Sequence, residues 1–191
     1  MKTNAQIKKA SKAALSGNWF AAVCVYLLYM LIAYVLGLSA VGSLFIGIAG
    51  FGYTAFCLEL AKKKHAGIGV LFGGMFKKFF KKWGASLLVS LYTFLWTLLF
   101  IIPGIVKSYS YALAPYILLE KPEMGIKDAI TKSRMMMKGH KWQLFCLDLS
   151  FIGWMLLCVL TLGIAFFYVW PYYSTARAQF YKELKRAPKK E

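Results

Sequence analysis

Three long apolar stretches, each opened by a tryptophan, dominate the pattern along the chain. The tryptophans are Trp19, Trp83 and Trp142, roughly sixty residues apart. Small residues, glycine or proline interrupt each stretch near its middle, and each half is about long enough, at ~1.5 Å per residue, to cross the ~30 Å hydrocarbon core of a bilayer. The pattern predicts an all-α integral membrane protein with six transmembrane helices paired as three hairpins. We expect the tryptophans to anchor the hairpins at the membrane interface.

The whole chain, 1–191, is predicted to form a single transmembrane domain. Its hairpins are expected at about 19–62, 83–120 and 142–173. The small residues of 37–42 are the predicted turn of the first hairpin. Pro103 and Gly104 are the predicted turn of the second, because a single helix over that stretch would far exceed the bilayer thickness. Gly163 is the predicted turn of the third.

Basic segments separate the hairpins. Residues 1–18 are expected to form an amphipathic helix, 66–82 and 122–141 to form interfacial connectors, and 174–191 to form a basic cytoplasmic tail. In the first connector, phenylalanines occupy one helical face and lysines the other, which favours an in-plane helix in contact with anionic lipid headgroups over a solvated run of charge. The predicted headgroup contacts are Lys77, Lys78, Lys81 and Lys82.

The order of basic helix, tryptophan and hairpin occurs three times. This indicates an internal repeat of about sixty residues, supported by pattern and not by residue identity.

The charge balance sets the expected orientation. The 191 residues include 24 Lys and Arg but only 7 Asp and Glu, for a net charge of +17, and 60% of the residues are hydrophobic. Every basic residue except Lys107 falls in one of four clusters between or beside the hairpins, so no nucleic-acid-binding face is indicated. The positive-inside bias then predicts a multi-pass membrane protein with both termini in the cytoplasm.

Asp148 is the acidic residue at the greatest predicted membrane depth. An unpaired carboxylate there would cost about 2.5 to 3.5 kcal/mol on insertion scales, so it needs a partner. Lys107 is expected to snorkel to the opposite interface, which disfavours a direct pair. The remaining candidates are hydroxyls or bases that reach inward: Ser108, Tyr109, Ser110, Tyr111, Arg134 and Lys141. A polar clamp that fixes helix packing is favoured over a substrate or ion pathway, because a transport site has more polar lining.

Motifs for catalysis are scarce. The two histidines, His65 and His140, have no metal-ligand partners at useful spacing, and no phosphate-binding glycine loop or nucleophile elbow occurs. The sequence therefore predicts no enzyme, no cofactor and no metal.

The second half of the chain contains several short sequence motifs that are specific enough to compare with known families. The stretches are Ile102-Pro103-Gly104-Ile105-Val106-Lys107, Ala114-Pro115-Tyr116-Ile117, Met137-Lys138-Gly139-His140-Lys141, Leu147-Asp148-Leu149-Ser150-Phe151-Ile152-Gly153-Trp154, and Pro171-Tyr172-Tyr173. In these the chain resembles a bacterial family of multi-pass membrane proteins known as domain of unknown function 975. It is also loosely similar to the membrane domains of some glycerophosphodiester phosphodiesterases. The resemblance implies an integral protein of a bacterial cytoplasmic membrane but supplies no activity or catalytic residue.

These observations lead to one functional hypothesis and one alternative. The hypothesis is a non-enzymatic, membrane-embedded interaction or accessory protein whose partners are membrane lipids with anionic headgroups, with a membrane protein or a second copy of the chain as further candidates. The alternative is a small transporter or lipid-handling protein with its polar site at Asp148. A water-accessible cavity at Asp148 would favour the alternative.

Overall fold

The computed structural model describes residues 3–39, 42, 45–62, 67–99, 101–161 and 163–186, and within them the chain is helical without strands. The first part of the chain holds α1 (Asn4–Leu15), α2 (Trp19–Gly37), α4 (Ile46–Ala61) and α5 (Ile68–Phe76). The second part holds α6 (Phe79–Leu99), α7 (Ile101–Tyr111), α8 (Ala114–Glu120), α9 (Ile126–Met136), α10 (Lys141–Leu149), α11 (Ile152–Leu160) and α12 (Phe166–Arg186). The all-α prediction is confirmed for this part of the chain.

Some predictions fall partly outside the described residues. These are 1–2 of the N-terminal helix, 40–41 of the first turn, 66 at the start of the first connector, and 187–191 of the tail.

Local signals in the sequence explain where several helices begin. Thr3 and Gln6 form a reciprocal capping box at the start of α1. Gly17 and Gly139 have φ angles of +83° and +81° in the short connections that lead to α2 and α10, a region that glycine enters without steric cost. Each of these glycines lies two or three residues before a tryptophan, at the start of the first and the third hairpin.

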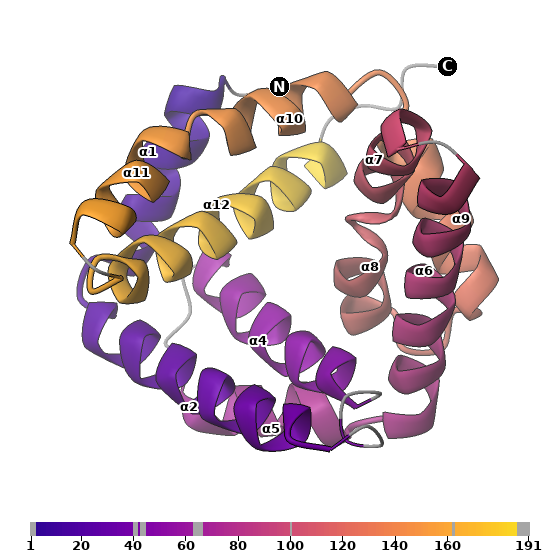
Figure 1. The fold of residues 1–191 in the computed structure, drawn as a ribbon, viewed down its shortest axis with the longest axis horizontal. Helices are drawn as coiled ribbons and strands as arrows, with labels where there is room; N and C mark the ends of the chain where they lie inside the picture. Colours follow the sequence, from indigo (N-terminus) through magenta and orange to yellow (C-terminus); the bar gives the residue numbers. More distant parts are fainter. Residues whose placement is uncertain are drawn as a thin grey trace.

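The three hairpins are arranged around a common centre. Figure 1 shows α2, α6 and the α10–α11 pair along the outline of the molecule, whereas α4, α8 and α12 return toward its middle. The amphipathic helix α1 packs against α12, and α5, whose residues are all apolar or glycine, packs against α4. The repeat expected from the sequence thus corresponds to three hairpins that follow one another around a ring.

Two of the tryptophans join neighbouring hairpins. Trp83, at the base of the second hairpin, stacks on Phe45 at the start of α4, with ring centroids 5.5 Å apart. Trp19, at the base of the first, stacks on Tyr168 near the start of α12, with centroids 4.0 Å apart. The base of one hairpin therefore lies beside the tip of another.

The prediction of six transmembrane helices is not confirmed, and these contacts do not fit an upright bundle. In an up-and-down bundle, the tips and the tryptophans would lie on opposite sides of the bilayer, about 30 Å apart. Within the described residues, two segments are long and apolar enough to cross a membrane, Trp19–Gly37 and Lys141–Leu160, while α4 is apolar but shorter. The length of an apolar stretch shows that a helix can enter a bilayer. It does not determine the tilt of that helix or which helices it packs against.

The predicted connectors and tail also differ from the structure. The surface helix expected across 66–82 is divided, because α5 ends at Phe76 and α6 begins at Phe79, with Lys78 between them at φ +55°. The predicted tail is the second half of α12, which continues to Arg186 and buries Ala176, Phe180 and Leu184. Those three apolar residues recur every four positions, a helical signal that the neighbouring basic residues concealed.

The predicted turn of the second hairpin, Pro103 and Gly104, lies inside a helix. Since α6 ends at Leu99 and α7 begins at Ile101, Pro103 and Gly104 lie in the first turn of α7. Proline is tolerated there because the first backbone N–H groups of a helix have no intrahelical partner. A Cβ atom at Gly104 would lie 2.7 Å from the Cα atom of Thr97, so this glycine lets α7 approach α6. Gly163, with φ +89°, lies between α11 and α12.

Glycine also sets the approach of α5 to α4. A Cβ atom at Gly74 would lie 2.7 Å from the Cβ atom of Ala55 and 2.9 Å from the Cα atom of Gly52, whereas one at Gly73 would meet nothing within 4 Å. The two adjacent glycines of α5 therefore form a matched pair.

We expect Gly74→Ala to destabilise the protein by about 1 to 3 kcal/mol through overpacking against α4. Gly73→Ala is the control and should leave stability unchanged or raise it by up to about 1 kcal/mol, because alanine favours the helix. Thermal unfolding of the detergent-solubilised variants measures both. Equal melting temperatures for the two would contradict the close α4–α5 contact.

Candidate functional site at the polar centre

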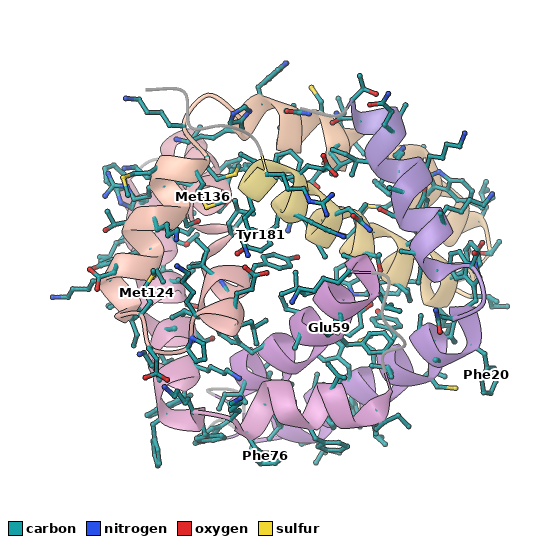
Figure 2. The ribbon with its side chains drawn as sticks, turned by 180° about the vertical axis from the view of Figure 1, so that it is seen from behind. Phe20, Glu59, Phe76, Met124, Met136 and Tyr181 are labelled. Atoms are coloured by element: carbon teal, nitrogen blue, oxygen red, sulfur yellow. The ribbon has the colours of Figure 1, made fainter. Side chains whose placement is uncertain are left out.

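The return helices of the three hairpins end at a shared polar centre built around Glu120. This residue closes α8, and its carboxylate accepts hydrogen bonds from the Tyr181 hydroxyl at 2.8 Å and the Lys185 ammonium at 2.5 Å, both from α12. Lys62, just after α4, lies 3.8 Å from its other oxygen and also pairs with Glu59 at 3.0 Å. Figure 2 shows Tyr181 and Glu59 in the middle of the molecule, with Phe20 and Phe76 at its rim.

The end of α4 is held by α12 in the same region. The Ala61 carbonyl, at the C-terminus of α4, accepts hydrogen bonds from the Gln179 amide at 2.9 Å and the Lys182 ammonium at 2.8 Å. A positive charge is favourable at this position because the carbonyls of the last helical turn carry partial negative charge. Burial and the hydrogen bond to Glu120 raise the pKa of Tyr181, so its hydroxyl remains a neutral donor. The centre is thus a network that ties one helix from each hairpin to the others.

Asp148 pairs with Arg177, a residue that the sequence had assigned to the tail. The Arg177 Nη2 and Nε atoms donate to the two carboxylate oxygens at 2.8 and 3.3 Å, which is a bidentate geometry. The side chains are 32% exposed for Arg177 and 16% exposed for Asp148, so the pair is only partly removed from solvent. Burial by itself would lower the pKa of Arg177, but the Asp148 carboxylate raises it overall.

Two tyrosines complete the surroundings of this pair. The hydroxyls of Tyr109 and Tyr173 interact with the Asp148 carboxylate, and the Arg177 guanidinium lies 5.2 Å from the Tyr173 ring centroid. Tyr109 was one of the predicted hydroxyl partners. The hollow beside Arg177 has a volume of about 10 Å³, room for about one water molecule. The arrangement therefore has the properties of a packing clamp between α10 and α12.

Ser110 and Tyr111 lie where the return arm of the second hairpin breaks. The arm was predicted as one span, but it is divided into α7 and α8. Ser133 of α9 bridges the break, because its hydroxyl donates to the Ser110 carbonyl at 2.7 Å and accepts from the Leu113 amide at 3.3 Å. The Tyr111 ring packs 6.2 Å from that of Tyr92. Broken helices at membrane depth need such partners for their free backbone groups.

Lys107 does not form an ion pair with Asp148, whose partner is Arg177. Its ammonium lies 4.2 Å from the ring centroid of Trp96, and it lines a surface cleft together with Arg134 and Lys141. The sequence had placed Lys107 toward the opposite side of the membrane from those two residues. In the structure it joins their basic cluster, because the second hairpin folds back beside α9.

The four lysines predicted to contact lipid headgroups have different environments. Lys77 is exposed and Lys81 half-buried. Lys78 forms an ion pair with Glu123, and that hydrogen bond lowers the pKa of Glu123. Lys82 is only 5% exposed and donates to the Gly74 carbonyl, and burial lowers its pKa. Lys82 is therefore a buried packing residue and not a headgroup contact.

The predicted interface anchors divide in the same way. Trp19 and Trp83 are half-buried in aromatic stacks, whereas Trp142 is 73% exposed and packs its ring 5.2 Å from Phe145. Only Trp142 presents most of its surface to the surroundings among these three.

Sequence reasoning missed both Glu120 and Arg177 as members of polar sites. Glu120 ended a predicted span, and Arg177 lay in what was read as a tail. The available signal was the helical spacing of apolar residues after Pro171, which shows that Arg177 belongs to a packed helix. Within the described residues, no group of three or more His, Cys, Asp or Glu side chains could hold a metal ion.

Residues 100–188 match the family model described as "Protein of unknown function (DUF975)". The match covers α7 to α12 and confirms the resemblance to this domain over that part of the chain. No curated protein and no solved structure matches the chain.

The Asp148–Arg177 pair makes a double-mutant test possible. We expect Asp148→Leu to cost about 1 to 3 kcal/mol, because it leaves Arg177 half-buried without its partner. Adding Arg177→Met should recover part of that loss, so that the double variant is more stable than the sum of the two single changes. Thermal unfolding in detergent gives the three values. Strict additivity would mean that the two side chains do not stabilise each other.

Proposed function

We propose that the protein is an integral protein of a bacterial cytoplasmic membrane that acts as an interaction or accessory protein, without catalysis, in contact with anionic lipid. The observation that carries this proposal is an apolar rim. The outer part of each hairpin's first arm exposes large hydrophobic side chains to an extent that a water-soluble surface does not tolerate. The rim residues are Leu27, Met30, Leu31, Tyr34 and Val35 of α2, Leu91, Phe94, Leu95 and Leu98 of α6, and Met155, Leu156, Leu157, Val159 and Leu160 of α11.

The orientation follows from the distribution of charge. The basic clusters on α1, on α9 and at the end of α12 favour the cytoplasmic side for both termini. Lys107, the single exception in the sequence, lies in the same cleft as Arg134 and Lys141. Since the hairpins contact one another from tip to base, the helices of this proposed arrangement are strongly tilted in the bilayer and not upright.

A structural role for Asp148 supports the accessory function over transport. Its carboxylate is paired with Arg177 in a bidentate geometry, and the hollow that Arg177 lines has a volume of only about 10 Å³. Transport sites require a binding space near the middle of the membrane that opens alternately to each side. The transporter alternative lacks a supporting observation at this site.

Reconstitution of the full chain into vesicles tests the proposal in two steps. We expect the protein to stay in the membrane after alkaline carbonate treatment, because its rim is embedded in hydrocarbon. We also expect the vesicles to hold an imposed proton or sodium gradient as long as protein-free vesicles do. Release by carbonate would contradict an integral protein. A leak that Asp148→Asn abolishes, with folding unchanged, would instead establish transport.

A further inference from the structure

Two adjoining hollows form one cleft at the junction of α6, α7, α9 and α10, away from the polar centre. They have volumes of about 380 and 370 Å³. Three residues line both of them: Lys107 from α7, and Thr131 and Arg134 from α9. The cleft is thus a continuous depression whose middle is formed by those three side chains.

The lining of the cleft is basic and contains no acid. Its cationic residues are Lys107, Lys127, Arg134, Lys138 and Lys141. Among the described residues none of these five has an ion-pair partner, although Asp148, Glu120 and Glu123 are each paired with a base elsewhere. The acid of α9, Asp128, lies in its first turn, near Gly125. Five cations around one depression repel one another, so an anion bound there would be stabilised.

The cleft also offers hydrogen-bond donors suited to a phosphate group. Thr131, which is exposed, lines both hollows, and Tyr92 lines the second. Ser110 also lines the first hollow, but its hydroxyl already donates to the Val106 carbonyl at 3.0 Å. The planar guanidinium of Arg134 can bind two phosphate oxygens at once. The Lys107 ammonium lies over the face of the Trp96 ring. This cation–π contact holds the positive charge at the cleft, where no carboxylate neutralises it.

Exposed apolar residues lie on the same helices that form the cleft. Leu91, Leu95 and Leu98 of α6 and Ile105 and Val106 of α7 are all exposed, and Met135 lines the first hollow and is 66% exposed. A free phosphate would gain nothing from contact with these apolar side chains, whereas the acyl chains of a lipid would pack against them. The junction therefore presents a basic site for a headgroup beside an apolar site for its chains.

We propose that this cleft binds the phosphate-bearing headgroup of an anionic phospholipid, with Arg134 and Lys107 on the phosphate and the acyl chains along α6 and α7. The proposal rests on the membrane embedding proposed above and gives its lipid contact a definite site. It also moves that contact from the lysines of 77–82, which are partly paired or buried, to the unpaired bases of α7, α9 and α10.

The test is lipid binding to the full-length protein in detergent, measured by native mass spectrometry and by thermal shift. The probes are phosphatidylglycerol, phosphatidylcholine and inorganic phosphate. We expect phosphatidylglycerol to bind in preference to phosphatidylcholine and to raise the melting temperature, and inorganic phosphate to do neither at equal concentration. Equal stabilisation by inorganic phosphate would overturn the assignment to a lipid.

Matched variants locate the site. Arg134→Gln with Lys138→Gln removes two exposed charges from the cleft, and Lys9→Gln with Lys12→Gln removes two exposed charges from α1. Each basic residue is worth about 1 kcal/mol toward anionic lipid, so the cleft variant should weaken phosphatidylglycerol binding by at least about tenfold. The α1 variant should stay within about twofold of the original. Equal losses in the two variants would overturn the site.

A charge-neutral variant provides a second check. Thr131→Tyr fills the middle of the cleft at an exposed helix position and should also weaken phosphatidylglycerol binding; unchanged binding would contradict the site. Carbonate extraction of the same proteins from reconstituted vesicles separates the two proposals. Protein that stays in the membrane without a headgroup preference refutes the cleft alone, whereas protein that is released refutes the embedding.

Discussion

The carboxylate of Glu120 joins the three hairpins at the centre of the molecule. It ends the return arm of the second hairpin, it accepts from Tyr181 and Lys185 of the third, and it attracts Lys62 at the end of the first. Gln179 and Lys182 add hydrogen bonds to the last carbonyl of α4. Because these hydrogen bonds and ion pairs run from one hairpin to another, the return helices end at one place. The outer helices α2, α6 and α11 then surround this polar centre.

This convergence explains the separation of polar and apolar surfaces. The middle of the molecule holds the ionic network, and the outer arms α2, α6 and α11 expose their hydrophobic side chains. Gly74, Gly52 and Gly104 allow the close helix contacts that such an arrangement requires, as small residues do where lipid supplies no hydrophobic force for helix association. A membrane would surround the rim, and the basic residues around α9 would meet its anionic surface.

Much of the helical content could be predicted from the sequence, while the arrangement could not. The length of the apolar stretch after Trp19 predicts α2 because hydrophobic length is a local property. The contact of Trp83 with Phe45 depends on packing between two hairpins, which no periodicity encodes. Asp148 was correctly expected to need a partner, because the free-energy cost of an unpaired carboxylate depends only on its position within the apolar stretch. That Arg177 is the partner depends on the path of α12, and reading residues 174–191 as a tail concealed it.

Proximity between the tip of the first hairpin and the base of the second is the most direct test of the ring. Phe45→Cys and Trp83→Cys would be combined in a chain whose four native cysteines, Cys24, Cys57, Cys146 and Cys158, are replaced by alanine. A protease site inserted between α4 and α5 would separate the two cysteines after cleavage. A cross-link between them then keeps the two fragments joined on a denaturing gel. The ring predicts efficient joining by a short thiol cross-linker in native membranes, where the ring centroids of the two residues lie 5.5 Å apart, and none with either cysteine alone. Fragments that separate completely would contradict the ring and would restore an upright bundle, in which the two positions lie about 30 Å apart on opposite sides of the membrane.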